Sequence, residues 1–329
     1  MKKLINNPEN VVKEMLQGLV LANSHLQLFA EESVIARANF TKKVGIISGG
    51  GSGHEPAHAG YVGFGMLDAA VCGEVFTSPT PFQVYKAIEE VNQGDGVLLV
   101  IKNYTGDVLN FEMAMDMARD NNIKVASVLV DDDVAMENST YTVGKRGVAG
   151  TVLVHKIAGS LAEQGASIET IQKIATDVVA NMATMGLSLG ACMTPASGKP
   201  SFDLPENEME VGLGIHGEPG IYRTKIASAK DCAELLMDKV LNHLKLNAGE
   251  EVCLLVNGLG ATPLMELDIM NYECHKILAT KGIKVFKNLV GNYMTALEMP
   301  GASITLLRMK AEFKEPLLAK ANTTFYKEV

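Results

Sequence analysis

The chain has no excess of positive charge, and this lack limits the partners that it can bind. It contains 29 Lys and Arg residues against 38 Asp and Glu residues, with a formal net charge of −9 and a pI of about 5.4. Proteins that bind nucleic acid or anionic membranes through electrostatics carry basic patches. We therefore expect neither nucleic acid nor a membrane surface as a partner.

Long apolar runs and paired cysteines are also missing. No stretch of about 18 apolar residues occurs, so the sequence predicts no transmembrane helix. The first eight residues turn polar after two apolar positions, which is unlike a secretory signal peptide. The five cysteines are scattered and form no Cys-x-x-Cys motif, a usage typical of a reducing compartment. These features together predict a cytoplasmic protein.

What the sequence does contain is an alternation of strand and helix patterns. A length of 329 residues with 47% hydrophobic residues favours two packed domains. In the N-terminal half, runs that are apolar on both faces alternate with helical patterns, which indicates a mostly parallel sheet covered on both sides. The strands are expected near residues 44–48, 69–75, 96–101 and 124–130.

The second half has a similar pattern. Two helical segments are expected from Thr151 to about Met185, and the strands that follow lie near 209–215, 252–256, 283–290 and 302–308. The prediction is therefore an α/β protein with domains at 1–183 and 184–329. Each domain is expected to hold a mostly parallel or mixed sheet flanked by helices, with the functional site in the crevice between them.

Three segments place polar side chains among residues that resist regular structure, and each follows a predicted strand. They are Ser48–Pro56, which contains His54, then Lys102–Asp107, and Gly212–Gly220, which contains His216. Open α/β sheets bind ligands at the loops that leave the C-terminal ends of their strands. We therefore expect the three segments to converge on one site.

Two short motifs match familiar patterns without the structural context that these patterns need. Gly212–Gly217 fits G-x-G-x-x-G, but Pro219 prevents the helix that a dinucleotide site requires. His54–His58 fits H-E-x-x-H, but loop residues precede it and Pro56 is tolerated only in a first helical turn. We expect neither a dinucleotide site nor a zinc protease, and interpret His58 as a packing or capping residue.

Other segments leave alternatives open. Gly49–Gly53 is a strand-to-helix loop that is interpreted either as a set of N–H groups facing an anion or a carbonyl oxygen, which its four glycines favour, or as a simple tight turn. Asp107 is either functional or the N-cap of a helix starting at Val108. A second reading of His216 is a histidine whose ring is satisfied by loop backbone.

Two acidic groups are interpreted as solvent-exposed. Asp131–Asp133 is expected to form a solvated loop rather than a metal site. Glu206, Glu208 and Glu210 alternate along an extended segment and are expected to form its solvent face.

Six motifs in order give the chain a resemblance to a known family. They are Ser48–Pro56, Gly73–Thr80, Ile101–Asp107, Gly198–Phe202, Gly214–Gly220 and Asn257–Pro263. With them the chain resembles the dihydroxyacetone kinases over essentially its whole length. It is most similar to the substrate-binding K subunits that use phosphate from the phosphoenolpyruvate:sugar phosphotransferase system.

The resemblance implies roles for individual residues. His216 matches the histidine that holds dihydroxyacetone covalently as a hemiaminal, and Glu218 is a candidate to fix its tautomer. Asp107 matches the base for the hydroxyl that accepts phosphate, and His54 matches a hydrogen-bonding partner of the substrate. Further substrate contacts are implied for Gly51, Ser52, Gly53, Lys102, Thr77 and Ser78.

The resemblance also implies partners. The chain is expected to stop where the ATP-binding half of single-chain kinases would begin, and to bind no metal or cofactor itself. A separate ADP-binding L subunit with Mg²⁺ supplies the phosphate, phosphocarrier proteins recharge it, and the K subunit forms a homodimer. Some relatives only sense dihydroxyacetone as co-activators of a transcription regulator. The presence of Asp107, His54 and Lys102 favours the kinase.

Overall fold

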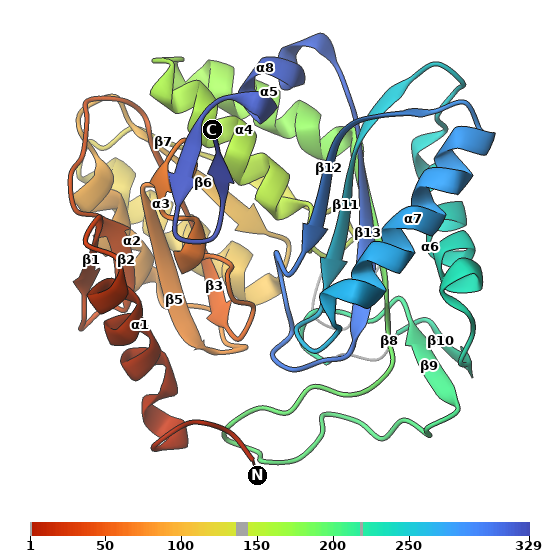
Figure 1. Ribbon diagram of the computed structural model, residues 1–329. Coiled ribbons are helices and arrows are strands. Elements are labelled where there is room, and N and C mark those ends of the chain that lie inside the picture. Colours follow the sequence, from red (N-terminus) through yellow and green to blue (C-terminus); the bar gives the residue numbers. More distant parts are fainter. Residues whose placement is uncertain (1, 136–143, 218–219) are drawn as a thin grey trace. The chain divides into compact units, whose positions relative to one another are not determined.

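The computed structural model describes residues 2–135, 144–217 and 220–329 (Figure 1). The chain forms two compact units, each assembled from segments that are distant in sequence. Unit 1 contains Met1–Val130, Thr151–Asp177 and Ala311–Val329, and unit 2 contains Asp131–Gly150 and Val178–Lys310. The division differs from the expected one at 183/184, because the chain passes from one unit to the other four times and the order of elements alone does not record these crossings.

Unit 1 is built on a six-stranded sheet with the strand order β1-β2-β5-β3-β6-β7. The strands β5, β3, β6 and β7 pair in parallel, as predicted, whereas β1 and β2 form an antiparallel edge. The bounds are β1 Leu26–Phe29, β2 Val34–Arg37, β3 Gly45–Ser52, β5 Ala69–Val75, β6 Val97–Lys102 and β7 Val125–Val130. Because the central strands are parallel, their C-terminal ends meet at one edge of the sheet.

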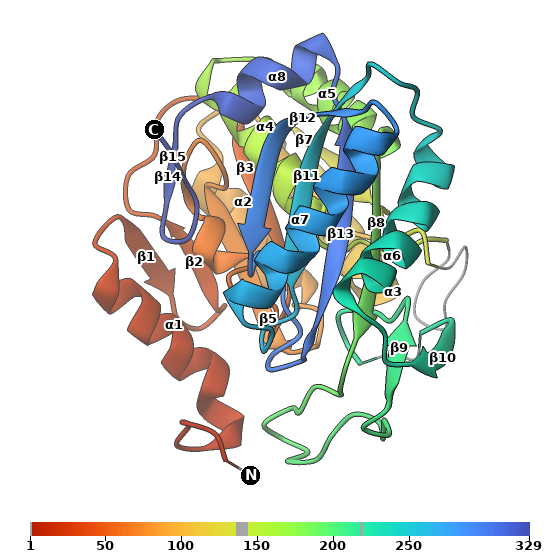
Figure 2. The same ribbon diagram turned by 45° about the vertical axis from the view of Figure 1, so that its right-hand side comes forward.

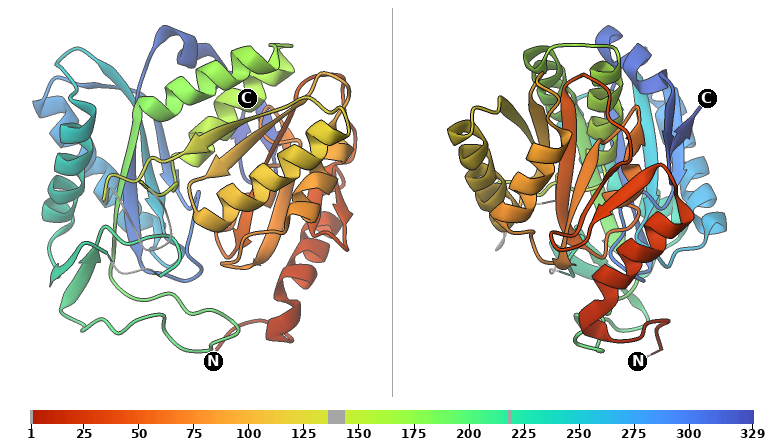
Figure 3. Two further views of the ribbon diagram at one scale, coloured as in Figure 1. Left: turned by 180° about the vertical axis from the view of Figure 1, so that it is seen from behind. Right: turned by 90° about the vertical axis from the view of Figure 1, so that its left-hand side faces the viewer.

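Helices cover both faces of this sheet. α2 (Pro81–Val91) and α3 (Thr105–Asp120) pack on one face, and Figure 3 shows α3 in yellow along the strands. α1 (Val11–Ala22) and α4 (Thr151–Glu163) lie against the other. The remaining elements are η1 Pro8–Asn10, η2 Ala59–Tyr61, β4 Gly63–Phe64, α8 Ala311–Leu318, β14 Ala321–Thr323, β15 Lys327–Glu328, and α5 Ile168–Ala180, which crosses the unit boundary.

Unit 2 has a second six-stranded sheet, in the order β10-β9-β8-β13-β11-β12. Only β11 and β12 pair in parallel, so this sheet is mixed and mostly antiparallel. α6 (Ala229–Leu244) and α7 (Leu264–Thr280) cover one face and bury a continuous apolar core against it (Figure 2). The strands are β8 Met182–Ser188, β9 Glu208–Val211, β10 Tyr222–Lys225, β11 Glu251–Gly258, β12 Lys284–Gly291 and β13 Gly301–Arg308.

Both units confirm the predicted α/β class, with local differences. Residues 182–185, expected to end a helix, belong to β8, and the strand expected at 209–215 ends at Val211. Helix α3 starts at Thr105 rather than Val108. Among the described residues, no helix is long and apolar enough to cross a membrane.

Candidate functional site

The glycine-rich segment after Ile47 is part of strand β3, not a loop as expected. Gly49 and Gly51 pair with Val71 and Gly73 of β5. A Cβ atom on Gly49 would lie 2.5 Å from the carbonyl oxygen of Val71, and one on Gly51 would lie 2.5 Å from the amide nitrogen of Thr77. Glycines stand here because neighbouring backbone approaches more closely than any side chain allows.

Lys102 and Asp107 form a buried pair beside this strand. Lys102 is the last residue of β6, and its Nζ atom lies 3.8 Å from Oδ2 of Asp107. The Lys102 side chain is fully buried, and that of Asp107 is 4% exposed. A Cβ atom on Gly50 would lie 3.1 Å from the Lys102 Nζ atom and 3.4 Å from Asp107 Oδ2. The glycine strand therefore leaves room for one cation and one carboxylate at the sheet edge.

Asp107 lies inside helix α3 and does not cap it. The helix begins at Thr105 and its N-cap is Tyr104, so Asp107 is the third helical residue. The capping interpretation of Asp107 was therefore wrong. A carboxylate in the first turn of a helix is stabilised by the free N–H groups and by the helix dipole. Asp107 thus receives support from the helix while it faces Lys102.

The loop after β5 brings Thr77 and Ser78 to the same edge. A Cβ atom on Gly106 would lie 2.8 Å from the Ser78 Oγ atom, so the start of α3 packs directly on this loop. The Asn110 side-chain amide donates a hydrogen bond to the carbonyl oxygen of Pro79 at 2.8 Å. The loop is thereby fixed to the helix that carries Asp107.

His54 follows β3 and is also buried. Its ring stacks on the ring of Phe76 at 5.0 Å between centroids and 21° between planes. The turn around it is held by two hydrogen bonds, since the Ser52 hydroxyl donates to the Gly73 carbonyl at 2.7 Å and the Gly53 amide donates to Glu55 at 3.0 Å. The stacking fixes the orientation of the His54 imidazole.

Two further buried histidines, His58 and His155, lie close to strand β3. Nδ1 of His58 is 2.9 Å from Nε2 of His155 in α4, and 3.4 Å from the Ser48 hydroxyl. Burial, with Lys102 nearby, lowers the pKa of His155 to about 3, and burial lowers the pKa of His58 well below its ordinary value. His58 is thus a packing residue, as expected, and it precedes η2 without capping it. His54 and His58 share no helix, unlike the two histidines of a zinc protease.

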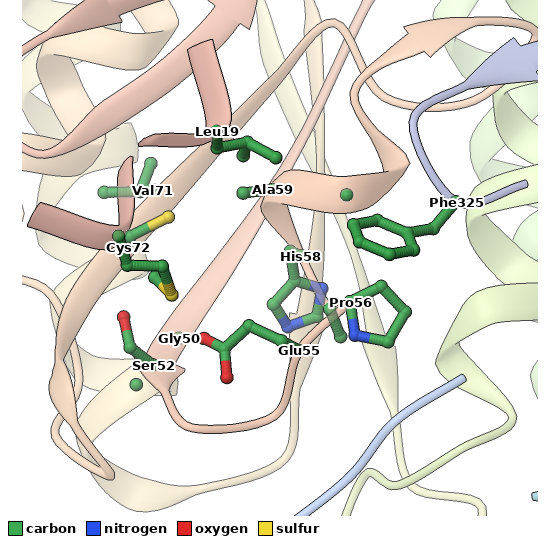
Figure 4. Close-up of a pocket in the computed structure, with 14 residues that line it drawn as sticks. Leu19, Gly50, Ser52, Glu55, Pro56, His58, Ala59, Val71, Cys72 and Phe325 are labelled. Atoms are coloured by element: carbon green, nitrogen blue, oxygen red, sulfur yellow. The ribbon is translucent and has the colours of Figure 1, made fainter. Parts of the chain in front are cut away.

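A cavity of about 230 Å³ lies beside the outer part of β3 in unit 1 (Figure 4). Its walls include Leu19 of α1, Val71 and Cys72 of β5, and Phe325. The Glu55 carboxyl group points toward Ser52 and Cys72, and burial raises the pKa of Glu55. Gly50–Ser52 also line this cavity, so one strand segment borders both the cavity and the Lys102–Asp107 pair.

Eight of the nine predicted site residues therefore gather at one edge of the unit 1 sheet. They come from the ends of β3, β5 and β6 and from the start of α3: Gly51, Ser52, Gly53, His54, Thr77, Ser78, Lys102 and Asp107. The ninth, His216, belongs to unit 2.

The His216 loop of unit 2 follows strand β9. The residues of the G-x-G-x-x-G pattern form bends and turns, and no helix begins among them, as predicted. Gly212 and Gly217 have φ angles of 75° and 81°. A Cβ atom on Gly217 would lie 2.6 Å from the Ser201 Oγ atom, so the loop packs tightly on the segment that contains Ser201. Glu218, the candidate tautomer partner, lies outside the described residues.

Glu210 supports the far end of this loop, and the solvent-face prediction was wrong for it. Its side chain is 5% exposed, and its carboxylate accepts a hydrogen bond from the Gly220 amide at 2.8 Å and one from Arg223 at 2.7 Å. Glu206 is exposed and Glu208 is half-buried. Met209–Val211 are all buried in this strand. A charged side chain in a buried strand needs a partner, so the charge of Glu210 is itself evidence of a structural role.

The acidic triplet is also more buried than predicted. Asp132 and Asp133 are buried, and only Asp131 is partly exposed. Asp132 accepts hydrogen bonds from the amides of Val148 and Gly150, both at 2.8 Å. The sequence gives no sign of this role, because the donors lie on a segment that becomes adjacent only in the fold.

The comparisons with known proteins fit this geometry. Residues 17–325 match the family model described as the Dak1 domain. The chain belongs to the Dak1 family. It is 52% identical over 314 residues to a Listeria innocua protein named PTS-dependent dihydroxyacetone kinase 1, dihydroxyacetone-binding subunit DhaK, with 95% of each chain covered. It is 44% identical over 342 residues to the corresponding PEP-dependent subunit of Escherichia coli, again with 95% of each covered.

Solved structures of Dak1 relatives have the same fold. A dihydroxyacetone kinase operon co-activator superposes with a TM-score of 0.92 at 38% identity, covering 96% of this chain and 98% of that one. The dihydroxyacetone kinase of C. freundii superposes with a TM-score of 0.90 at 34% identity, covering 99% of this chain and 60% of that one. The family predicted from the six sequence motifs is thus confirmed.

Proposed function

We propose that this chain is the dihydroxyacetone-binding subunit of a kinase that draws phosphate from the phosphoenolpyruvate:sugar phosphotransferase system. The names of the Listeria and Escherichia relatives support this function. The observation that carries the proposal is the buried Lys102–Asp107 pair beside Gly50, because phosphoryl transfer to a hydroxyl needs a base and capture alone does not. The L subunit, with ADP and Mg²⁺, and the phosphocarriers are its partners.

His216 is proposed to hold the substrate covalently. One ring nitrogen of the neutral imidazole adds its lone pair to the ketone carbon and forms a C–N bond. The carbonyl π electrons move to oxygen, which takes up a proton, and the second ring nitrogen gives one up. The product is a neutral hemiaminal. A bond to carbon suits a ligand that is too small for many weak contacts, and it selects short carbonyl compounds over polyols.

Asp107 is proposed to act as the base in the second step. Its carboxylate takes the proton of the substrate hydroxyl while the hydroxyl oxygen bonds to phosphorus and the bond from phosphorus to the nucleotide of the partner subunit breaks. Lys102 balances the charge of the carboxylate, and His54 donates a hydrogen bond to a substrate oxygen. Backbone and hydroxyl groups at Gly51, Ser52, Gly53, Thr77 and Ser78 complete the substrate contacts. Neither metal nor nucleotide is proposed on this chain.

The test is formation of dihydroxyacetone phosphate from phosphoenolpyruvate by this chain with the L subunit, ADP, Mg²⁺ and the phosphocarriers. We expect product to depend on this chain and the Asp107→Asn variant to be slower by about 10²–10⁴-fold while it still captures dihydroxyacetone. An Asp107→Asn variant with undiminished rate would remove Asp107 as the base. A homodimer, also proposed here, would appear as twice the chain mass in analytical ultracentrifugation.

A second function is favoured by the likeness to the operon co-activator. A sensor of dihydroxyacetone would need the His216 adduct but not the Asp107 base. If the chain captures dihydroxyacetone and yields no product with all partners present, the sensor replaces the kinase. Absence of both adduct and product would exclude both functions.

A further inference from the structure

Arg146 of unit 2 is a buried cation with two defined partners. Its side chain is 1% exposed. The Nε atom donates a hydrogen bond to Oδ2 of Asp133, and Nη2 donates one to the carbonyl oxygen of Gly212, both at 2.7 Å. The planar guanidinium thus links a carboxylate to the backbone of the loop that carries His216.

Gly212 is the point where β9 gives way to this loop. Its amide donates to the carbonyl oxygen of Gly186 at 2.8 Å, and its φ angle of 75° favours glycine. A Cβ atom there would lie 2.8 Å from a side-chain carbon of Ile221 and 2.9 Å from the Cβ atom of Ala135. The N–H and the carbonyl group of Gly212 are therefore both hydrogen-bonded, and Gly212 is four residues before His216.

Asp133 is itself held in place. Its Oδ1 atom accepts a hydrogen bond from the Ala135 amide at 2.9 Å, and its own amide donates to the Arg146 carbonyl at 3.0 Å. The neighbouring Asp132 accepts a hydrogen bond from the Thr184 hydroxyl at 2.5 Å. Because Thr184 lies in β8, the acidic segment is fixed to the sheet. Arg146, which binds this segment, therefore holds Gly212 at a fixed position relative to the sheet.

A buried ion pair of this kind needs a reason other than stability. Desolvation of the two charges offsets most of their attraction, and apolar pairs of similar volume are often at least as stable. What the pair supplies is direction, since Asp133 holds the rigid guanidinium plane by one hydrogen bond and the plane orients the Gly212 carbonyl by another. An attacking nucleophile depends on such placement, because a shift of about 1 Å can cost on the order of 100-fold in rate.

We propose that Arg146, held by Asp133, is a positioning residue for His216. Arg146 fixes the backbone at Gly212, where the loop begins. Through the loop it determines the angle at which the imidazole attacks the carbonyl carbon. Arg146 is not a catalytic residue here, since it acts through the Gly212 backbone. The proposal rests on the proposed covalent role of His216.

The test compares four full-length proteins: the unaltered chain, Asp133→Leu/Arg146→Met, Arg146→Lys, and the control Asp131→Asn/Lys145→Gln. The control removes the neighbouring pair, in which Lys145 lies 3.9 Å from Asp131 and both side chains are partly exposed. Adduct formation is followed by NMR with dihydroxyacetone labelled with ¹³C at the carbonyl carbon, with His216→Ala as the blank. Thermal unfolding and the ¹⁵N resonances of the His216 ring are recorded for each protein.

We expect the apolar pair to unfold no earlier than the unaltered chain and to form adduct about 10- to 100-fold more slowly. Arg146→Lys should recover part of the rate, the control should match the unaltered protein, and the His216 ring resonances should shift only in the Arg146 variants. Unchanged adduct formation in the apolar pair would overturn the proposal. If the Asp133→Leu/Arg146→Met variant does not fold, Arg146→Lys is used in its place, and unchanged adduct formation in Arg146→Lys would overturn the proposal.

The experiment separates this proposal from the proposed function. No adduct with the unaltered chain would contradict the covalent role of His216. The ring resonances would still test the positioning, and unchanged resonances in both Arg146 variants would refute it. An adduct that forms equally in every protein except His216→Ala would preserve the covalent role and remove the role of Arg146.

Discussion

The Nζ atom of Lys102 lies 3.8 Å from Oδ2 of Asp107, and the backbone of Gly50 passes close to both. A Cβ atom on Gly50 would push the pair aside by a few tenths of an ångström, and the φ angle of 155° at Gly50 also favours glycine. The relationship ties a strand, β3, to Asp107, the proposed base, on helix α3. It also makes Gly50 a direct probe of the site.

Gly50→Ala should slow dihydroxyacetone phosphate formation by roughly tenfold or more, because a displacement of a few tenths of an ångström at the charged pair misaligns the proposed base. The rate is measured in the coupled assay with the L subunit. Gly18→Ala is the control, since no atom lies within 4 Å of its Cβ position in α1. That change should leave the rate intact and stabilise the helix by up to about 1 kcal/mol. Equal rates in both variants would contradict the assignment of this site.

His155→Gln should make the acid side of the stability profile less steep. The pKa of His155 is lowered to about 3 in the folded chain, against an ordinary value near 6.5, so the unfolded chain binds more protons between these values. Stability from the neutral ring is therefore complete above about pH 6.5 and is lost as the pH falls, by about 1.4 kcal/mol per pH unit. Glutamine keeps a polar partner for His58 and removes this titration.

The measurement is the free energy of unfolding in urea for the unaltered chain and for His155→Gln, at several values between about pH 5 and pH 7. This range includes the pH at which the loss of stability is expected to begin. His25→Gln, at an exposed position, is the control and should keep the slope of the unaltered chain. A slope that His155→Gln leaves unchanged would show that the buried ring is not the titrating group.

The parts of the fold that follow from local pattern were predicted from the sequence. β6 begins with a continuous apolar run, β7 is apolar except for Ser127, and α6 has a serine N-cap and helical spacing. β8 was missed because Met182–Ser188 contains Met, Ala and Leu, which suit a helix equally well. Pairing of β8 with β13, more than a hundred residues away in the chain, decides its conformation.

For the site, the sequence predicted the residues at strand ends but not the residues that support the His216 loop. Strand ends located Lys102 and Asp107, because a parallel sheet brings such ends to one edge. Glu210 and Arg146 were missed because each supports the loop through a backbone group: the Gly220 amide is ten residues from Glu210, and the Gly212 carbonyl is 66 residues from Arg146. A single sequence carries no pattern for a side chain that supports a loop through its peptide groups.

Glu210→Ala should weaken dihydroxyacetone capture, because it leaves the Gly220 amide and Arg223 without their carboxylate partner. We expect a loss of about 1–3 kcal/mol of stability and a lower fraction of NMR-detected adduct. Glu206→Ala, at an exposed position on the same segment, should change neither quantity. Glu210→Gln keeps an acceptor for the Gly220 amide and should recover part of the adduct. Full capture by Glu210→Ala would mean that the loop needs no support at this end.

Gly217→Ala should abolish most of the adduct for a reason that is separable from backbone strain. Gly217 and Gly249 have similar φ angles, 81° and 90°, so alanine at either position costs about 1–2 kcal/mol. Only at Gly217 would the new Cβ atom meet a neighbour, 2.6 Å from the Ser201 Oγ atom, whereas Gly249 has open space. Gly249→Ala therefore measures strain alone and should retain capture.

Combining Gly217→Ala with Ser201→Gly removes the colliding hydroxymethyl group and keeps the strain. If packing against Ser201 places the His216 loop, the double variant should capture more dihydroxyacetone than Gly217→Ala while its thermal stability stays below that of the unaltered chain. Equal capture by the single and double variants would mean that the collision with Ser201 does not cause the loss. Capture by Gly217→Ala equal to that of Gly249→Ala would mean that adduct formation does not depend on how this loop packs.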